Sequence, residues 1–322
     1  MIRKSKRPLV SILCVTYNHS AFISQAIDSF LMQKTNFSYE ICLGEDGSSD
    51  GTAGICRQYA ERNPEKIRLF ERDRADVVYI DNKPTGRFNF IETLNECKGE
   101  YIAICDGDDY WTDPCKLQKQ IDFLIDKKYD LVHTNCSTLE NGILKKRVNH
   151  HGTIKDIRSQ LLIKNIISTL TVCVRRTAIQ DAVKIIATKY RAADLALWMH
   201  ISQKYRIGYI NSDTAVHRVS YNSVSNPASK NDQWLFIKSA FELKYDFIER
   251  YEYSQKVISQ VNHRWCRLLI KFYIKNEDSD IKVELHDFMG SIQGESLWIY
   301  KLILFPIRIN LVMRMLKKLW RD

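Results

Sequence analysis

Short apolar runs alternate with segments of helical periodicity over the first hundred residues. Four short segments rich in apolar residues read as strands: residues 9–15, whose apolar run is compact and β-branched, and residues 39–44, 66–72 and 100–105. Between them, apolar residues spaced three and four apart predict helices within residues 22–31, 48–63 and 88–98. This alternation predicts an α/β fold with a mostly parallel central sheet flanked by helices.

The pattern changes along the rest of the chain. We expect a helix after Pro114, strands at residues 129–136 and 168–176, and a helix at residues 192–205. From about residue 230 the apolar spacing is helical. We therefore expect a main domain over residues 1–225, with halves at about 8–113 and 114–225, followed by a helical region over residues 226–322.

Polar residues gather where the predicted strands end. The first strand leads into Thr16, Tyr17 and Asn18, the second into Glu45 and Asp46, and the fourth into the run DGDD, residues 106–109. In open α/β sheets, ligands bind outside the carboxyl ends of the strands. All three clusters are therefore expected to line one crevice.

Charge narrows the class of ligand. The formal net charge is +10, but residues 1–8 contribute +4 and residues 298–322 contribute +5, which leaves +1 for the body of the chain. A nucleic-acid groove would need basic residues along the body. The sequence therefore disfavours a nucleic-acid partner.

The cellular compartment is predicted from three features. The nine cysteines form no C-x-x-C pair, and their odd number fits reduced thiols in a cytosolic compartment. The basic N-terminus leads into an apolar run too short for a signal peptide, and no run approaches the roughly 20 residues of a spanning helix. We expect a cytoplasmic protein.

The acidic run offers a metal site. Hard divalent cations such as Mg²⁺ and Mn²⁺ prefer carboxylate oxygens and are completed by water or phosphate. A haloacid-type phosphatase also uses Asp-x-Asp, but there the motif lies near the N-terminus and Thr or Val follows. A dinucleotide oxidoreductase needs G-x-G-x-x-G after the first strand, where this chain has TYNHSAF. The spacing disfavours both alternatives.

Four segments together resemble one known family. They are VSILCVTYNH, ICLGEDGSSDGT, CKGEYIAICDGDDYWTDPCKLQKQIDFL and AADLALWMHISQKYRIGYINSDTAVHRV, within residues 8–225. They look like the inverting family 2 glycosyltransferases of bacterial surface polysaccharide synthesis. The resemblance implies a GT-A fold, with a nucleotide-binding half and an acceptor half. It also implies a nucleotide-sugar donor and a divalent metal.

The resemblance also assigns residues. Thr16, Tyr17 and Asn18 match the first-strand motif of the nucleotide pocket. Glu45 and Asp46 match the family's paired acids, and Asp46 is similar to the acid that binds the uracil ring. Glu45 stands where relatives usually have the shorter Asp. Asp106 and Asp108 match the metal-binding D-x-D, and Asp106 is also implied to contact the nucleotide. Asp109 matches the adjoining acid. Arg87 and Asn89 fall where relatives contact the nucleotide.

Inverting transfer needs a base opposite the leaving diphosphate. Position alone would make Asp194 a helix cap, but the resemblance places it at the family's base. The sequence departs from the family twice nearby: Ala193 precedes the Asp, and Ser220 stands where many relatives carry a histidine. Either the chain lacks that histidine's help or His217 supplies it, although a structural histidine is the alternative at residue 217.

The C-terminal end has the pattern of a surface helix. After Pro306, apolar residues fall on one helical side and basic residues on the other, which suits an anionic bilayer or packing on the protein's own core.

Taken together, the residues and the resemblance lead us to expect a metal-dependent inverting glycosyltransferase that moves a sugar from a UDP-sugar to a saccharide or lipid-linked acceptor. The alternatives are a nucleotidyltransferase and a catalytically degenerate nucleotide-binding module.

Overall fold

The computed structural model describes residues 7–146, 156–186, 190–219 and 229–276. The chain divides into two compact units, residues 1–240 and 241–322, each described by itself below. Several predicted features lie outside the described residues. They are the basic helix near the C-terminus, Ser220, the domain boundary at residue 225, and His150 with His151, which could belong to an acceptor loop.

The first unit is built on one nine-stranded sheet. Its strand order is β3-β2-β1-β6-β10-β8-β11-β7, and β9 pairs with β8. The strands are β1 (Val10–Thr16), β2 (Tyr39–Glu45), β3 (Ile67–Glu71), β6 (Tyr101–Ile104), β7 (Tyr110–Trp111), β8 (Leu131–Glu140), β9 (Ile143–Lys145), β10 (Cys173–Arg175) and β11 (Ile207–Val219). The first four strands of this order are parallel, and β8 and β11 are parallel to each other. The α/β architecture predicted from the sequence is confirmed.

Two short strands are antiparallel to their neighbours, and one of them, β10, joins the two halves of the sheet. β10 runs antiparallel between β6 and β8, and β7 pairs antiparallel with β11. The acidic run lies between β6 and β7, so its two ends are fixed in the sheet at different places. The sequence pattern did not predict β7 because two residues carry no readable period.

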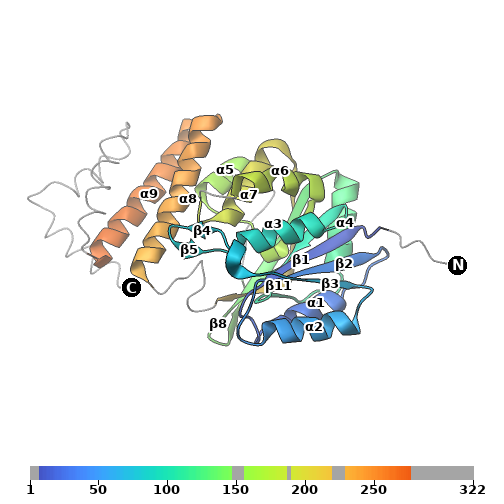
Figure 1. Cartoon of the computed structure of the whole chain (residues 1–322). Helices are drawn as coiled ribbons and strands as arrows, with labels where there is room; N and C mark the ends of the chain where they lie inside the picture. Colours follow the sequence, from blue (N-terminus) through green and yellow to red (C-terminus); the bar gives the residue numbers. More distant parts are fainter. Residues whose placement is uncertain (1–6, 147–155, 187–189, 220–228, 277–322) are drawn as a thin grey trace, which may run out of the picture. The chain divides into compact units, whose positions relative to one another are not determined.

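Helices cover both faces of the sheet. They are α1 (Ile23–Leu31), α2 (Thr52–Arg62), α3 (Arg87–Glu96), α4 (Lys116–Lys127), α5 (Ile157–Ile163), α6 (Arg176–Ile186) and α7 (Ala193–Lys204). In Figure 1, α1 and α2 lie below the sheet and α3 lies above it. Short β4 (Tyr79–Ile80) and β5 (Lys83–Pro84) form a separate hairpin before α3.

Alternation along β1 decides which residues form the core. Ile12 and Cys14 pack in the same core cluster as the apolar residues of α1. In that cluster, Phe30 of α1 meets Trp111 of β7 edge-on, with 4.9 Å between the ring centroids. Complete burial of one such side chain stabilises the fold by about 2 kcal/mol. On the other face, α3 approaches so closely that a Cβ on Gly44 would lie 2.2 Å from Thr93 Oγ1. Only glycine fits that position.

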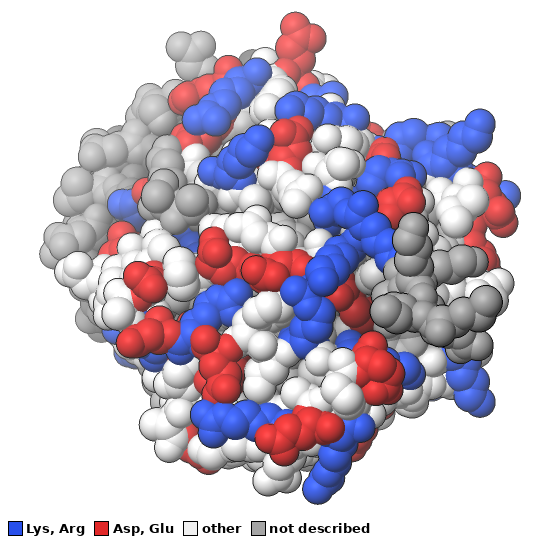
Figure 2. Space-filling view, turned by 45° about the vertical axis from the view of Figure 1, so that its right-hand side comes forward, with Lys and Arg blue, Asp and Glu red and all other residues white. Residues whose placement is uncertain are grey.

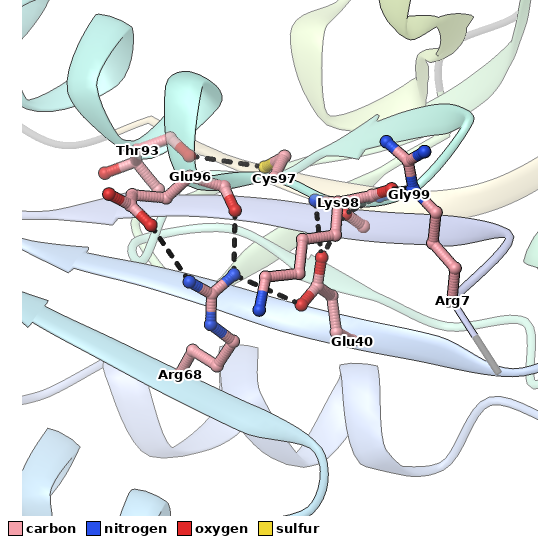
Figure 3. A network of polar contacts seen from close by, with 9 residues as sticks. Arg7, Glu40, Arg68, Thr93, Glu96, Cys97, Lys98 and Gly99 are labelled. Atoms are coloured by element: carbon pink, nitrogen blue, oxygen red, sulfur yellow. Dashed lines mark hydrogen bonds and ion pairs between the residues drawn. The ribbon is translucent and has the colours of Figure 1, made fainter. Parts of the chain in front are cut away.

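A polar network ties the amino ends of the parallel strands together (Figure 3). Glu40 is buried and accepts hydrogen bonds from Ser11 Oγ at 2.6 Å and from the Lys98 backbone N–H at 2.7 Å. Its second oxygen lies 3.3 Å from Arg68, which also donates to Glu96 Oε2 at 2.9 Å. The network holds β1, β2 and the turn before β6 in register from the end opposite to the acidic run.

The second unit is helical where it is described. It comprises the end of α8 (Lys230–Arg250) and α9 (Gln255–Asn276), because the division between the units falls within α8. Phe241 stacks on Trp265 at 4.5 Å between centroids, and Tyr245 donates to Asn262 Oδ1 at 2.8 Å. No helix in the described part of the chain is both long enough and apolar enough to cross a bilayer.

The buried network predicts a stability effect. Replacing Glu40 with Ala leaves Arg68, Ser11 and the Lys98 N–H without their common acceptor. We expect the free energy of unfolding to fall by about 3 kcal/mol, measured by urea denaturation.

The matched control is Glu71→Ala. Glu71 is also paired with an arginine, Arg57, at 2.6 Å, but both side chains are exposed. The free energy of unfolding of Glu71→Ala should therefore hardly change. Equal losses in the two variants would contradict the role given to Glu40.

Candidate active site

The loops after β1, β2 and β6 meet at the carboxyl edge of the parallel strands. The Asp46 N–H donates to Thr16 O at 3.1 Å, and the Gly107 N–H donates to Val15 O at 2.9 Å. Both bonds follow from the parallel register, in which Thr16 lies beside Glu45. The three loops therefore lie side by side at one edge of the sheet; that they line a single crevice stays a prediction.

Asn18 joins the first two loops. Its φ of 53° lies in the left-handed region, where Asn is tolerated better than most residues. Its N–H donates to Ser48 Oγ and its Oδ1 accepts from the Ser49 N–H, both at 2.9 Å. The side chain of Asn18 is therefore occupied in shaping the loops.

The two acids after β2 have different surroundings. Glu45 folds back on its own loop and accepts from the N–H groups of Gly47 at 3.1 Å and Ser48 at 2.8 Å. Asp46 is buried, and burial raises the pKa of its carboxyl group although Arg74 acts in the opposite sense. The longer Glu side chain thus has a structural use at this position.

Arg74 is a site residue that the sequence reasoning missed. Its guanidinium donates to Asp46 Oδ2 at 2.7 Å and lies 3.8 Å above the ring centroid of Tyr17, which is 39% exposed. The other oxygen, Asp46 Oδ1, is buried and has no hydrogen-bond partner among the described residues. Arg74 follows β3, so the strand-end rule that found the other loops would have found it too.

The acidic run is packed tightly against β1. A Cβ on Gly107 would lie 2.6 Å from Thr16 Oγ1 and 2.9 Å from Ile23 Cδ1, so this position needs glycine. Asp106 and Asp108 therefore extend from a loop that lies directly against the first strand. Asp109 is buried, and its Oδ1 accepts from the Arg218 N–H at 2.7 Å.

Arg218 of β11 is the cation that faces this loop. Its guanidinium donates to the backbone oxygen of Asp108 and to Gln25, and lies 4.6 Å from the ring centroid of Tyr110. Burial and the neighbouring Asp108 raise the pKa of Asp109 well above its usual value, against the hydrogen bond from Arg218. The charge of Arg218 offsets part of the negative charge that is gathered here.

Asp194 lies in the first turn of α7. The helix begins at Ala193 and its N-cap is Ala192, so Asp194 is not the cap. Its carboxylate accepts from Asn165 Nδ2 at 2.9 Å and from the Leu195 N–H, both of which favour the ionised form, whereas burial raises its pKa. His217 lies close enough for its charge to lower that pKa.

Electrostatic coupling links Asp194 to the acidic run. Burial, then Asp108, then Asp194 raise the pKa of Asp106 to about 7. Two carboxylates almost ninety positions apart in the sequence are therefore near enough to repel each other. Such mutual repulsion is relieved when a cation binds between the carboxylates.

Arg87 and Asn89 sit at the start of α3 and are both buried. Arg87 donates to the backbone oxygen of Tyr190, and burial lowers the pKa of its guanidinium group. Asn89 donates to Gly44 O at 2.9 Å and accepts from Thr93 at 3.2 Å. These contacts are to the protein itself, and nucleotide binding by either residue stays a prediction.

The donor set suits a metal that arrives with a ligand. Within the described ranges, no three His, Cys, Asp or Glu side chains form a group able to hold a metal ion alone. Mg²⁺ in phosphate sites is usually held by one or two carboxylates, and phosphate oxygens and water complete the shell. Asp106 and Asp108, which repel each other without a cation, fit that arrangement.

Comparison with known proteins gives the family. The sequence profile described as glycosyl transferase family 2 matches residues 11–187, more than half of the chain. The chain belongs to glycosyl transferase family 2. The matched residues include the loops after β1, β2 and β6 and end before Asp194.

Proteins of similar sequence align with this chain over different lengths. An uncharacterised Mycobacterium tuberculosis protein is 39% identical over 115 residues, which is 36% of this chain and 31% of that protein. The chain thus spans about a third of the length of its mycobacterial relatives. The Bacillus subtilis glycosyltransferase TuaG, named for teichuronic acid biosynthesis, is 28% identical over 81% of this chain and 93% of its own length.

Solved structures share the fold. Staphylococcus aureus TarS, residues 1–349 in complex with UDP-GlcNAc, superposes with a TM-score of 0.65 at 17% identity, covering 88% of this chain and 81% of that one. The mannosyltransferase of Pyrobaculum calidifontis, in complex with GDP-Man and Mn²⁺, gives 0.57 at 16% identity, covering 99% and 89%. The chain has the GT-A fold that the sequence resemblance implied.

The crowding of carboxylates predicts a pH-dependent stability effect. The pKa of Asp106 in the folded state is about 7, above its ordinary value of 3.8, so the folded state holds this proton more tightly than the unfolded state. Stability is therefore lost as the pH rises from about 4 to about 7. Asp106→Asn should raise the thermal midpoint at pH 8 in chelator and change it little at pH 4, as measured by calorimetry.

The control is Asp122→Asn, on the exposed side of α4, where the carboxylate contacts Gln118. It should give the same small change at both pH values. A loss of stability at pH 8 in Asp106→Asn would show that repulsion does not govern this site.

Proposed function

We propose that the protein is a metal-dependent, inverting glycosyltransferase that moves a sugar from a nucleotide diphosphate donor to a saccharide or lipid-linked acceptor. The observation that carries the proposal is the convergence of Asp194 with the D-x-D loop. Asp194 comes from a different segment, and it lies near enough to the loop suited to a metal diphosphate for its charge to raise the pKa of Asp106. Inverting transfer needs such an arrangement, with one base and a separate site that stabilises the leaving group.

The nucleobase end of the donor is expected at Tyr17, Asp46 and Arg74. A planar base can stack on the exposed ring of Tyr17, and Asp46 Oδ1 can accept a hydrogen bond from a ring N–H such as that of uracil. The structures of TarS with UDP-GlcNAc and of the mannosyltransferase with GDP-Man support a nucleotide sugar. A UDP-sugar is our proposed donor, with Thr16 and Asn18 shaping the pocket.

The diphosphate end is expected at the acidic run. Asp106 and Asp108 would hold Mn²⁺ or Mg²⁺, which would neutralise the charge that develops on the leaving diphosphate. Asp109, which we also predict to support the metal, is anchored by the Arg218 N–H and braces the loop from behind. The complex of the related fold with Mn²⁺ supports a divalent ion here.

Asp194 is the proposed base. The acceptor hydroxyl oxygen forms a bond to the anomeric carbon, the bond from that carbon to the diphosphate oxygen breaks with its electron pair, and the hydroxyl proton passes to the Asp194 carboxylate. Burial raises the pKa of Asp194, which makes the carboxylate a better proton acceptor. Asn165 and the Leu195 N–H hold the carboxylate in place.

We place the reaction in cell-surface polysaccharide synthesis, at the cytoplasmic side of the membrane. TuaG, which aligns over most of this chain, is named for the synthesis of such a polymer. A basic amphipathic segment at residues 298–322 would bring the enzyme to lipid-linked acceptors.

Substitution of the base gives the first test. Asp194→Asn should reduce sugar transfer by about 10³-fold, because it removes the proton acceptor but keeps the shape. Binding of the donor should be unchanged. Transfer is measured as UDP release from a panel of UDP-sugars in the presence of extracted lipid-linked saccharides. The control is Asp181→Asn on α6, where Asp181 pairs with Lys204, and its turnover should match the wild type. If Asp194→Asn turns over as fast as the wild type, Asp194 is not the base.

Nucleotide binding gives the second test. Calorimetric titration should show UDP binding with Mn²⁺ and weak or absent binding in chelator. Asp108→Asn should weaken the Mn²⁺-dependent binding at least about tenfold, and the exposed Asp122→Asn should not. If UDP and GDP bind equally with and without the metal, the acidic run has no part in donor binding.

Removal of residues 298–322 tests the membrane proposal. The full chain should sediment with vesicles that contain anionic phospholipid, and the truncated chain should remain in the supernatant at moderate salt. Equal sedimentation of both chains would place membrane contact elsewhere.

A further inference from the structure

His19 lies between the nucleotide loop and the acidic run. It follows Asn18 in the loop after β1, and its N–H donates to Thr52 Oγ1 at the start of α2, at 2.9 Å. Its ring nitrogen Nδ1 lies 3.2 Å from Thr16 Oγ1. Backbone and ring are thus both fixed, and the second ring nitrogen, Nε2, is directed by these contacts.

Nε2 of His19 points towards Asp108. The distance from Nε2 to Asp108 Oδ2 is 3.9 Å, which is too long for a hydrogen bond. Among the described residues, no other hydrogen-bond partner of Nε2 is found. A polar nitrogen and a carboxylate oxygen therefore face each other across a gap without contact.

The width of that gap suits a shared metal ion. Metal ions of this size bind nitrogen or oxygen at about 2.1 Å, so two donors on the same ion lie at most about 4.2 Å apart. The 3.9 Å between Nε2 and Oδ2 falls within that limit.

The contact with Thr16 also suits ligation. A histidine that binds a metal through one nitrogen usually donates its other N–H to a fixed acceptor, which sets the tautomer. With Nδ1–H donating to Thr16 Oγ1, the lone pair of Nε2 is directed to the Asp108 side. Thr16 is itself packed directly against Gly107.

We propose that His19 is a ligand of the divalent metal, binding through Nε2 beside Asp108. The inference rests on the proposed metal diphosphate site and extends it by one residue from a different loop. His19 would then connect the loop that shapes the nucleotide pocket to the loop that holds the metal, so that occupation of either stabilises both. It also gives the ion a nitrogen donor, which favours Mn²⁺ over Mg²⁺.

The test is pulsed electron paramagnetic resonance of the full chain with Mn²⁺ and UDP, and in parallel with Mn²⁺ and GDP. A directly bound imidazole gives a nitrogen modulation of the Mn²⁺ echo that a nearby structural histidine does not. His19→Asn can keep the contact with Thr16 through its shorter amide but has no group at Nε2. We expect the modulation to disappear and Mn²⁺ affinity in the nucleotide complex to fall about tenfold or more.

His217→Gln is the matched control, because His217 is the histidine close to Asp194. It should leave the modulation unchanged. Modulation that survives in His19→Asn, or that disappears in His217→Gln, would overturn the proposal and leave the metal diphosphate site in place. Mn²⁺ that binds without nitrogen modulation in the wild type would do the same. Failure of Mn²⁺ to bind with either nucleotide would sink both this proposal and the metal-dependent function.

Discussion

Repulsion among carboxylates at one end of a parallel sheet is the constraint on which this site depends. Asp106, Asp108 and Asp109 belong to a single short loop, and Asp194 approaches them from α7. Three contacts hold these charges together. Gly107 packs against Thr16, the Arg218 N–H donates to buried Asp109, and Glu40 keeps the strands in register at their amino ends. The resulting loop is closely packed, and Arg218 offsets only part of its negative charge, so the remaining repulsion is what a cation relieves.

The sequence predicted the parallel half of the sheet well because its strands are continuous apolar runs with helices between them. It predicted the position of the acidic run and of the loops after β1 and β2, because parallel strands must end at one edge. It could not predict β7 or the hairpin β4–β5, which have only two residues per strand. The long strand β11 was not predicted at all, since its polar positions hide the pattern of a strand.

Residues missed at the site share one property: their roles depend on contacts between distant segments. Arg218 acts on Asp108 and Asp109 from more than a hundred positions away, and no spacing in the sequence connects them. Arg74 pairs with Asp46 across a shorter interval and follows a strand end, so it was within reach of the same reasoning. Asn89 shows the opposite case, because a position favoured by family resemblance makes contacts that hold α3 on β2.

The pairing of Arg74 with Asp46 and Tyr17 has a consequence for how such enzymes diversify. These contacts come from the loops after β1, β2 and β3, whereas the acidic run is held by Gly107 against Thr16 and by Arg218 of β11. Under the proposed function, a substitution at Arg74 would alter the nucleobase end of the donor site and leave the contacts of Gly107 and Arg218 in place. A change of donor base would then require no change in the acidic run.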